Sequence, residues 1–309
     1  MNLESKKKLV AVVGQGCAFE QEPMKDHTTF RIGGPADLFL CPHSITEIQQ
    51  LVRICKEDQI PYYIMGNGSN LLVSDEGYRG VIIQIYENFN QIQIEGTVVT
   101  AQAGALLALI AKKALKESLT GFEFASGIPG TLGGAAVMNA GAYGGEMKDV
   151  LLEVTALTKE GEILILPKEQ LELGYRTSIV SKKDYMVLEA KIGLDHGDYE
   201  SISSLMEELT EKRTSKQPLE FGSGGSTFKR PEGYFAGKLI MDSGLRGFQI
   251  GDAQVSEKHC GFVINRGNAT AKDVRQVMGH VIDTVKDKFG VTLEPEIKML
   301  GEFNTPLTP

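Results

Sequence analysis

Apolar residues recur at helical spacing in two stretches of the chain, one after Ser44 and one after Thr270. Each stretch predicts an amphipathic helix with one face against a core. Ser44 and Glu47 form the capping-box pattern that begins many helices, and Gly290 suits the left-handed turn that ends them. The long apolar stripe before Gly290 predicts a core surface with no chemical role.

Two further helices and a set of strands follow from composition and alternation. We expect helices over Leu106 to Leu119, rich in Ala, Leu and Lys, and over about Tyr199 to Lys216. Strands and hairpins alternate with these helices, which favours an α+β fold over a regular βαβ winding. The expected strands are 62–65, 81–85 and 186–192, with hairpins around Glu95-Gly96 and around the turn 159–162.

The chain length of 309 residues predicts about two domains. The Gly/Ser run after the helix at 199–216 places the boundary near Asp198. We therefore expect an N-terminal segment at 1–27, a first domain at 28–197 and a second at 198–309. The first domain would divide into two subdomains, about 28–87 and 88–197.

The N-terminus imitates two known signals. Three lysines precede the apolar run 9–13, as in a signal peptide, but this run is shorter than the roughly 7–15 residues such a segment needs. The run is strand-like and leads into Gly14-x-Gly16, as in a dinucleotide fingerprint. The third glycine position holds Phe19 and no helical pattern follows, so the sequence excludes both readings.

Composition and charge restrict the class of protein. Hydrophobic residues make up 42% and charged residues 23%, which is typical of a folded chain. A net charge of −8 argues against nucleic acid or an anionic membrane as a partner, and no protein partner is evident. The cysteines are scattered without a CxxC pair, which predicts reduced thiols and a cytoplasmic protein. They are Cys17, Cys41, Cys55 and Cys260.

Glycine is enriched, and its 35 residues include three dense segments at 32–36, 66–70 and 127–134. Residues 125–145 as a whole are glycine-dense and show no periodicity. Each segment alone could be an ordinary loop. Glycine also lets the backbone approach a ligand, and successive N–H groups in such turns form anion sites. Three such segments near short strands favour a long phosphate-bearing ligand, and a flavin dinucleotide fits better than a mononucleotide.

Six motifs in order resemble those of the UDP-N-acetylenolpyruvoylglucosamine reductase family. The resemblance extends from about residue 25 to 301, nearly the whole chain. The motifs are TTFRIGGPA at 28–36, GNGSNLL at 66–72, SGIPG at 126–130, YRxS at 175–178, GSTFK at 225–229 and LEPE at 293–296.

The resemblance implies a fold and an activity. The fold is α+β, with a two-part FAD-binding domain of the vanillyl-alcohol-oxidase type followed by an α+β substrate-binding domain. The activity is reduction of UDP-N-acetylglucosamine enolpyruvate to UDP-N-acetylmuramate, with NADPH as reductant of FAD. This is an oxidoreductase step in bacterial peptidoglycan precursor synthesis, without a nucleic acid or membrane partner.

The resemblance implies three catalytic residues, and each has suitable chemistry. Arg176 offers a planar, permanently charged fork for the carboxylate on which negative charge develops. Ser226 would donate the proton to C2, and it is preferred to Ser223 because only Ser226 matches Gly-Ser-x-Phe-Lys. Glu296 would polarise the intermediate or assist its proton transfer, with Glu294 as the alternative in register. Apolar and charged residues alternate over 292–299, which predicts a strand with both carboxylates on one face.

The remaining site residues are expected to hold the cofactor and the substrate. The predicted substrate contacts are Tyr175, Lys229 and Arg230. Lys229 and Arg230 are the preferred members of a cation cluster that also contains Lys212, Arg213 and Lys216. His259 is expected to be structural, and no metal is predicted. The expected FAD contacts are Gly66, Asn67, Gly68, Ser69, Asn70, Ser126, Gly127, Ile128, Pro129, Gly130, Gly133 and Gly134.

The spacing indicates a subclass and leaves two alternatives open. Only 50 residues separate Arg176 from Ser226, which resembles the shorter subclass that lacks a Tyr loop closing over the substrate diphosphate. One alternative is another FAD-dependent oxidoreductase with the same cofactor domain, which need not carry the Ser226 and Glu296 motifs. The other is a flavin-binding protein without catalysis, which is expected to lack one of the three residues.

Overall fold

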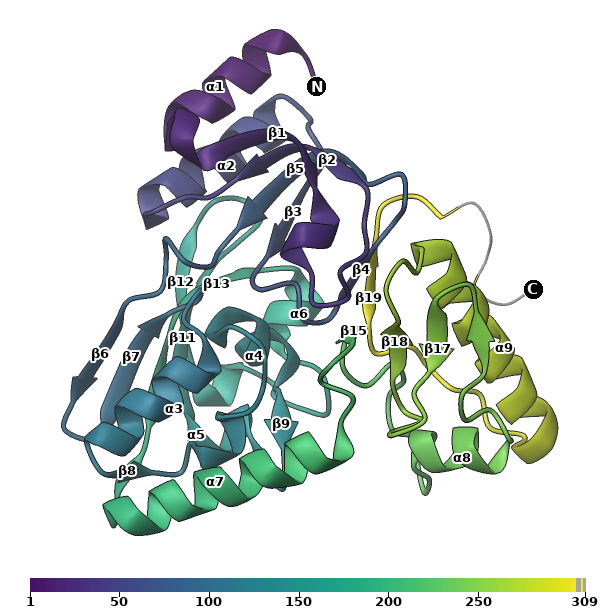
Figure 1. The fold of residues 1–309 in the computed structure, drawn as a ribbon. Helices are drawn as coiled ribbons and strands as arrows, with labels where there is room; N and C mark the ends of the chain where they lie inside the picture. Colours follow the sequence, from purple (N-terminus) through teal and green to yellow (C-terminus); the bar gives the residue numbers. More distant parts are fainter. Residues whose placement is uncertain (304–306, 308–309) are drawn as a thin grey trace. The chain divides into compact units, whose positions relative to one another are not determined.

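The computed structural model describes residues 1–303 and 307. The chain forms two compact units, each assembled from separate segments. Unit 1 contains residues 1–19, 38–67 and 80–213, and unit 2 contains residues 20–37, 68–79 and those from Thr214 onward. The mixture of mainly antiparallel sheets and separate helices confirms the expected α+β class (Figure 1).

A four-stranded sheet with the order β1-β2-β5-β3 begins the fold. Its strands β3 and β5 are parallel. The helix after Ser44 is confirmed as α2, because the Ser44 side chain accepts a hydrogen bond from the Glu47 N–H, and α2 packs against α1. These elements are α1 (Leu3–Val13), β1 (Ala18–Pro23), β2 (Pro35–Leu40), α2 (Ile45–Glu57), β3 (Tyr62–Met65) and β5 (Tyr78–Gln84).

A five-stranded antiparallel sheet with the order β12-β11-β13-β7-β6 forms the rest of the unit 1 core. Helix α4 packs against the central strands β13 and β7. The strands are β6 (Ile92–Glu95), β7 (Val98–Gln102), β11 (Leu151–Leu157), β12 (Ile163–Pro167) and β13 (Met186–Gly193). The helices are α3 (Leu107–Lys116), α4 (Leu132–Met138), α5 (Met147–Val150), α6 (Ile179–Lys183) and α7 (Tyr199–Lys216).

Short strand pairs complete unit 1. Strand β8 pairs with β14, and β9 pairs with β10, both antiparallel. They are β8 (Leu119–Thr120), β14 (Asp195–His196), β9 (Gly141–Ala142) and β10 (Gly145–Glu146). Four short 3-10 turns lie at Gln15–Cys17, Met24–His27, Glu123–Ala125 and Lys168–Gln170.

Unit 2 is built on an antiparallel sheet with the order β15-β18-β17-β16, covered by the long helix α9 (Figure 1). The α9 stripe is buried as predicted. A parallel pair joins β4 to β19. The elements are β4 (Leu71–Val73), β15 (Gly222–Ser223), α8 (Ala236–Asp242), β16 (Gln249–Ile250), β17 (Ala253–Val255), β18 (Val263–Asn265), α9 (Ala271–Phe289) and β19 (Lys298–Leu300).

Three sequence expectations need correction. The run 9–13 lies in helix α1 rather than a strand-like segment. The glycine-rich stretch 125–145 contains helix α4, whose small residues show no amphipathic period. The alternation at 292–299 becomes the strand β19 only from Lys298 onward, and before it Pro295 makes a single bridge to Phe228.

In the described part of the chain, no helix combines the length and the apolar character needed to cross a membrane.

The domain limits 28–197 and 198–309 stay predictions, because compactness does not define which residues bind cofactor or substrate.

A carboxylate from a distant segment holds the start of α9. The Asp75 side chain, just after β4, accepts hydrogen bonds from the N–H groups of Ala271 at 2.7 Å and Lys272 at 3.0 Å. Both donors lie in the first turn of the helix, where N–H groups have no partner within the helix and a negative charge is favourable. Asp75 therefore fastens the segment 68–79 to the core helix of unit 2.

We predict that Asp75→Ala lowers the free energy of unfolding by about 1–2 kcal/mol, because two N–H groups of the first turn lose their acceptor. Glu76→Ala is the matched control, since Glu76 is an exposed neighbour whose hydrogen bonds are made by its main chain. Urea unfolding of both variants measures the effect. Equal losses in the two variants would contradict the capping role.

Candidate active site

Two of the glycine-rich segments meet within unit 1. The Asn67 side chain donates to the Pro129 carbonyl at 3.0 Å. Gly66 lies so close to Thr131 that a Cβ at position 66 would overlap the threonine hydroxyl. This close approach explains why the sequence has glycine at position 66.

The backbone of these two segments offers hydrogen-bond donors to a ligand. Within the described residues, the N–H groups of Gly66, Asn67, Gly127 and Gly130 donate to no acceptor. Converging N–H groups in turns suit phosphate oxygens. The donors of unit 1 therefore fit the diphosphate of a dinucleotide such as FAD.

Arg213 packs beside this loop. A Cβ at Gly127 would lie 3.1 Å from Cδ of Arg213, so the arginine stem covers the glycine. Burial lowers the pKa of Arg213, and Tyr143 opposes this shift. Lys212, its neighbour in the predicted cation cluster, instead forms an ion pair with Glu208 along the helix. Arg213 is thus the member of that cluster that lies at the predicted FAD loop.

The two glycines at 133 and 134 have different surroundings. A Cβ at Gly133 would lie 2.9 Å from Cβ of Ala103, and the Gly133 N–H donates to the Ala103 carbonyl at 2.8 Å. Gly133 therefore allows α4 to pack closely on the sheet. Gly134 is exposed, so the predicted contact with a cofactor has room there.

Arg176 lies in a tight turn of unit 1. Gly174 and Thr177 exchange main-chain hydrogen bonds at 3.1 and 3.3 Å, which forces Tyr175 and Arg176 into the bend. Arg176 adopts φ 56°, a left-handed conformation that is costly for a non-glycine residue. Its guanidinium lies 5.3 Å from the centre of the Tyr175 ring. The strained turn presents both predicted residues together.

Two polar residues anchor this turn: Asn139, which the sequence analysis did not identify, and Ser178, the last residue of the YRxS motif. Asn139, itself at φ 45°, donates to the Gly174 carbonyl at 3.0 Å and to Glu146 at 2.8 Å. The buried Ser178 hydroxyl donates to the Val137 carbonyl at 2.7 Å. Asn tolerates the left-handed region better than most residues, and its place just after the small-residue helix is the available sequence signal.

Helix α4 connects the cofactor loop to Arg176. Its first residues follow the 127–131 loop, and its last turn, through Val137 and Asn139, holds the 174–178 turn. Seven helical residues span about 10 Å, so α4 is a short rigid spacer. The distance between the N–H donors and the Arg176 anchor is therefore set by one packed element.

Ser226 and Glu296 come together in unit 2 through main-chain pairing. The Glu296 N–H donates to the Thr227 carbonyl at 2.8 Å, and the Lys229 N–H donates to the Glu294 carbonyl at 2.8 Å. Phe228 and Pro295 form the antiparallel bridge between them. Ser226 is exposed beside this pairing, after Gly225 at φ 79°. Residues 70 positions apart in sequence are thus neighbours across one short ladder.

The same pairing distinguishes Glu296 from Glu294. The Glu294 carboxylate forms a 3.0 Å ion pair with Lys229, and its side chain is 71% exposed. Glu296 is half-buried, and its carbonyl accepts a hydrogen bond from the Asn70 side chain at 3.2 Å. Asn70 belongs to the GNGSN segment, whose last three residues lie in unit 2. This packing favours Glu296 as the site residue.

Thr227 stabilises the ladder through buried hydrogen bonds. It is fully buried, and its hydroxyl accepts a hydrogen bond from the Val263 N–H at 2.8 Å. Its own N–H donates to the Gly261 carbonyl at 2.8 Å. All three polar groups of Thr227 are therefore satisfied, and the residue joins the Ser226 loop to β18.

The predicted substrate residues are accessible. Tyr175 is 55% exposed, and Lys229 and Arg230 follow the Ser226 ladder. The Arg230 guanidinium stacks at 4.0 Å over the ring of Phe235, which is 60% exposed. An exposed cation on an aromatic ring suits recognition of an anionic, planar ligand.

His259 has the structural surroundings expected for it. Its Nδ1 accepts a hydrogen bond from the Gly261 N–H at 3.1 Å, and its ring packs edge-on against Phe262. Burial lowers the pKa of His259, which favours the neutral ring that this bond needs. Among the described residues, no group of three or more His, Cys, Asp or Glu side chains is arranged to hold a metal.

We predict that Thr227→Val costs about 1–3 kcal/mol of unfolding free energy, because the buried Val263 N–H loses its acceptor. Thr227→Ser keeps the hydroxyl, so it should cost about 1 kcal/mol or less for the lost methyl group. Amide hydrogen exchange at Val263 should accelerate in the valine variant alone. Unchanged exchange there would show that the hydroxyl does not hold the ladder.

We predict that the stability of the protein depends on pH through His259. Its folded pKa lies below the unfolded value of about 6.5, so the unfolded chain binds the proton more tightly and acid destabilises the fold. His259→Asn keeps an acceptor but does not titrate. As the pH falls from about 7.5 to 5, the difference in unfolding free energy should shift in favour of the variant. A constant difference over this range would refute the assignment.

Comparisons with known proteins agree with these local features. Residues 36–166 match a family model described as FAD binding domain, and residues 217–300 match the C-terminal domain of UDP-N-acetylenolpyruvoylglucosamine reductase. Such a reductase from Alkaliphilus oremlandii is 52% identical over 97% of this chain and 99% of its own length. The Clostridioides difficile reductase is 55% identical over 91% of this chain and 92% of its own length.

A solved structure leads to the same family. The crystal structure of the reductase from Thermus caldophilus has a TM-score of 0.78 and 34% identity. The match covers 90% of this chain and 97% of that one. With curated relatives matched over almost their entire length, this chain belongs to the UDP-N-acetylenolpyruvoylglucosamine reductase family.

Proposed function

We propose that this protein reduces UDP-N-acetylglucosamine enolpyruvate to UDP-N-acetylmuramate, using FAD and NADPH. The observation that carries the proposal is the identity of 52–55% with named reductases over nearly the whole chain. The presence of Arg176, Ser226 and Glu296 in fitting local structures supports it. The product is a precursor of peptidoglycan, so the reaction belongs to cell-wall synthesis.

The cofactor would bind to the glycine-rich segments. The unpartnered N–H groups of Gly66, Asn67, Gly127 and Gly130 supply donors for the diphosphate, and Gly134 leaves space for it. The other predicted contacts are Gly68, Ser69, Asn70, Ser126, Ile128, Pro129 and Gly133. When bound, FAD supplies hydride to C3 of the enol ether after NADPH has reduced it.

Arg176 would bind the carboxylate of the enolpyruvyl group. Hydride addition at C3 leaves negative charge at C2 and on this carboxylate, and a bidentate guanidinium stabilises that charge more than it stabilises the substrate. The left-handed turn and its anchors, Asn139 and Ser178, fix the backbone of Arg176 beforehand. A group fixed in advance does not reorganise when the charge develops.

Ser226 would donate the proton to C2, and Glu296 would assist. A serine hydroxyl is a weak acid, but a proton donor held close to a basic carbon gains from proximity. Thr227 lies opposite Glu296 in the ladder and directly follows Ser226, which supports a shared role for the two residues. The Glu296 carboxylate would then polarise the intermediate or assist its proton transfer.

Substrate recognition would use Tyr175, Lys229 and Arg230. Lys229 and Arg230 offer positive charge for the diphosphate of the sugar nucleotide, which an acidic chain must provide locally. Arg213, beside Gly127, adds a charge at the predicted cofactor loop.

The absence of a CxxC pair and the four thiols support a cytoplasmic location.

An anaerobic visible spectrum tests the whole proposal. NADPH should bleach the flavin band of the protein, and UDP-N-acetylglucosamine enolpyruvate should restore it. A band that bleaches and does not return would favour another FAD-dependent oxidoreductase. A band unaffected by NADPH would favour a flavin-binding protein without this catalysis.

We predict that Ser226→Ala leaves reduction of the flavin by NADPH unchanged and slows its reoxidation by the sugar nucleotide by about 10²–10⁴-fold. Ser223→Ala is the matched control in the same loop, because the Ser223 bonds to Thr29 involve its main chain. Stopped-flow spectroscopy separates the two half-reactions. Equal slowing of both half-reactions would remove Ser226 from the role of proton donor.

A further inference from the structure

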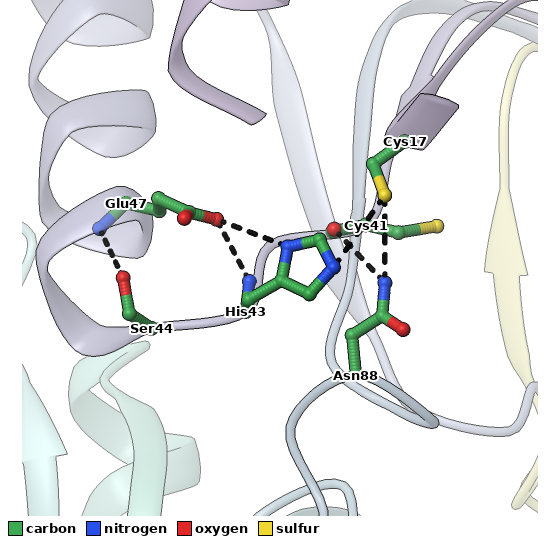
Figure 2. Close-up of polar contacts among 6 residues, drawn as sticks. All are labelled: Cys17, Cys41, His43, Ser44, Glu47 and Asn88. Atoms are coloured by element: carbon green, nitrogen blue, oxygen red, sulfur yellow. Dashed lines mark hydrogen bonds and ion pairs between the residues drawn. The ribbon is translucent and has the colours of Figure 1, made fainter. Parts of the chain in front are cut away.

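Cys17 lies in a polar cluster that the proposed reaction does not use (Figure 2). It ends the 3-10 turn Gln15–Cys17, just before β1, and is partly exposed. Its sulfur lies 3.6 Å from Nε2 of His43, within hydrogen-bonding distance for sulfur. A thiol beside an imidazole is the arrangement that converts cysteine to a nucleophile.

His43 is oriented by Glu47. Nδ1 of His43 lies 3.5 Å from the Glu47 carboxylate, and the main-chain N–H of His43 donates to the same carboxylate at 2.8 Å. Glu47 in turn lies in the first turn of α2, where Ser44 accepts from its N–H. A proton on Nδ1 faces the carboxylate, which leaves the lone pair of Nε2 directed to Cys17. Cys17, His43 and Glu47 therefore form a relay from thiol to imidazole to carboxylate.

Asn88 and Cys41 complete the cluster. The Asn88 side-chain N–H group donates to the Cys17 sulfur at 3.7 Å and to the Cys41 carbonyl at 3.3 Å. Amide donors near sulfur stabilise a thiolate and a polar oxidised form of the sulfur. All five residues belong to unit 1. Figure 2 shows His43 and Asn88 beside the Cys17 sulfur, with Glu47 on the far side of the His43 ring.

The main chain places the two cysteines opposite each other. Cys17 precedes β1, Cys41 follows the neighbouring strand β2, and the Cys41 N–H donates to the Cys17 carbonyl at 2.9 Å. Residues directly opposite each other in an antiparallel pair have Cα atoms about 4.5–5.5 Å apart, which lies within the range of about 4.4–6.8 Å that a disulfide spans. The Cys41 thiol donates to the Gln84 side chain at 3.9 Å, so the side chain must rotate out of this contact for its sulfur to reach Cys17.

The other two cysteines have different surroundings. Cys55 is buried in the core of unit 1, and burial raises its pKa to about 12. Cys260 is buried in the core of unit 2. Neither offers a partly exposed sulfur, so they serve as internal controls.

We propose that Cys17 is a peroxide-reactive thiol, activated by His43 and Glu47, and that Cys41 resolves its oxidised form to a Cys17–Cys41 disulfide. The oxidant is hydrogen peroxide. The thiol proton passes to Nε2 of His43, the sulfur attacks one peroxide oxygen, and the O–O bond breaks as the S–O bond forms. The sulfur loses two electrons, and the departing hydroxide takes the proton from His43 to leave as water.

Resolution follows by attack of Cys41. Its sulfur displaces hydroxide from the Cys17 sulfenic acid, so that the S–S bond forms as the S–O bond breaks. The proton of Cys41 leaves with the hydroxide as water. Two thiols and one hydrogen peroxide thus give one disulfide and two waters.

Peptide mass spectrometry of the purified full-length protein tests the site. The protein is treated with hydrogen peroxide, quenched, alkylated under denaturing conditions and digested. We expect linked peptides containing Cys17 and Cys41, while Cys55 and Cys260 remain available to the alkylating reagent. Oxidation of Cys17 no faster than that of Cys260 would overturn the proposal.

Variants test the roles within the cluster. In Cys41→Ser, the sulfenic acid should persist at Cys17 and be trapped by dimedone. His43→Gln should slow oxidation of Cys17 at least about tenfold. His196→Gln, an exposed histidine on β14, is the matched control and should leave the rate unchanged. Equal rates in His43→Gln and His196→Gln, or no dimedone adduct in Cys41→Ser, would exclude the proposed activation and resolution.

Discussion

The pairing of Thr227 with Glu296 is the interaction on which the proposed site in unit 2 depends. One hydrogen bond of 2.8 Å between main-chain groups brings together two segments that are remote in sequence. This bond is made by main-chain groups, so it does not require particular side chains at positions 226 and 296. The burial of Thr227 and its bond from Val263 protect this pairing from water. A buried polar group with every partner present is rigid, since any displacement leaves a donor or an acceptor unpaired.

In unit 1, a helix rather than a strand pairing holds the proposed site residues in place. Helix α4 carries the predicted FAD loop at one end and the anchors of Arg176 at the other. Gly133 lets it pack tightly on the sheet, which removes freedom of the spacer. The strain at Arg176 is supported by bonds from Asn139 and Ser178, as expected where a backbone conformation is held for a function. Local contacts within each unit thus hold the backbone of the proposed catalytic residues.

The glycine-rich segments serve several physical purposes. Gly66 permits close approach to Thr131, Gly133 permits close packing of a helix, and Gly225 provides a positive φ before Ser226. Only some of these positions leave N–H groups available to a ligand. The Cys17 cluster, in contrast, has no recognisable motif in the sequence. Its residues become neighbours only when β1, β2 and α2 pack together.

Much of the fold followed from the sequence by itself. The capping residues Ser44 and Thr270 and the apolar stripes after them determined α2 and α9, because helix signals are local. The motif set identified the family and its three candidate residues. Helix α4 was missed because its small residues carry no hydrophobic period and its formation depends on packing against β13 and β7.

Only the tertiary structure decided which residues are neighbours. Alternation at 292–299 could not separate Glu296 from Glu294, since both lie on one face of an extended segment. The pairing with Thr227 and the ion pair of Glu294 with Lys229 separated them. The roles of Asn139, Ser178 and Thr227, and the meeting of Cys17 with His43, likewise depend on contacts between distant segments. A sequence records residue types and local periods, whereas hydrogen bonds between remote segments exist only after the chain has folded.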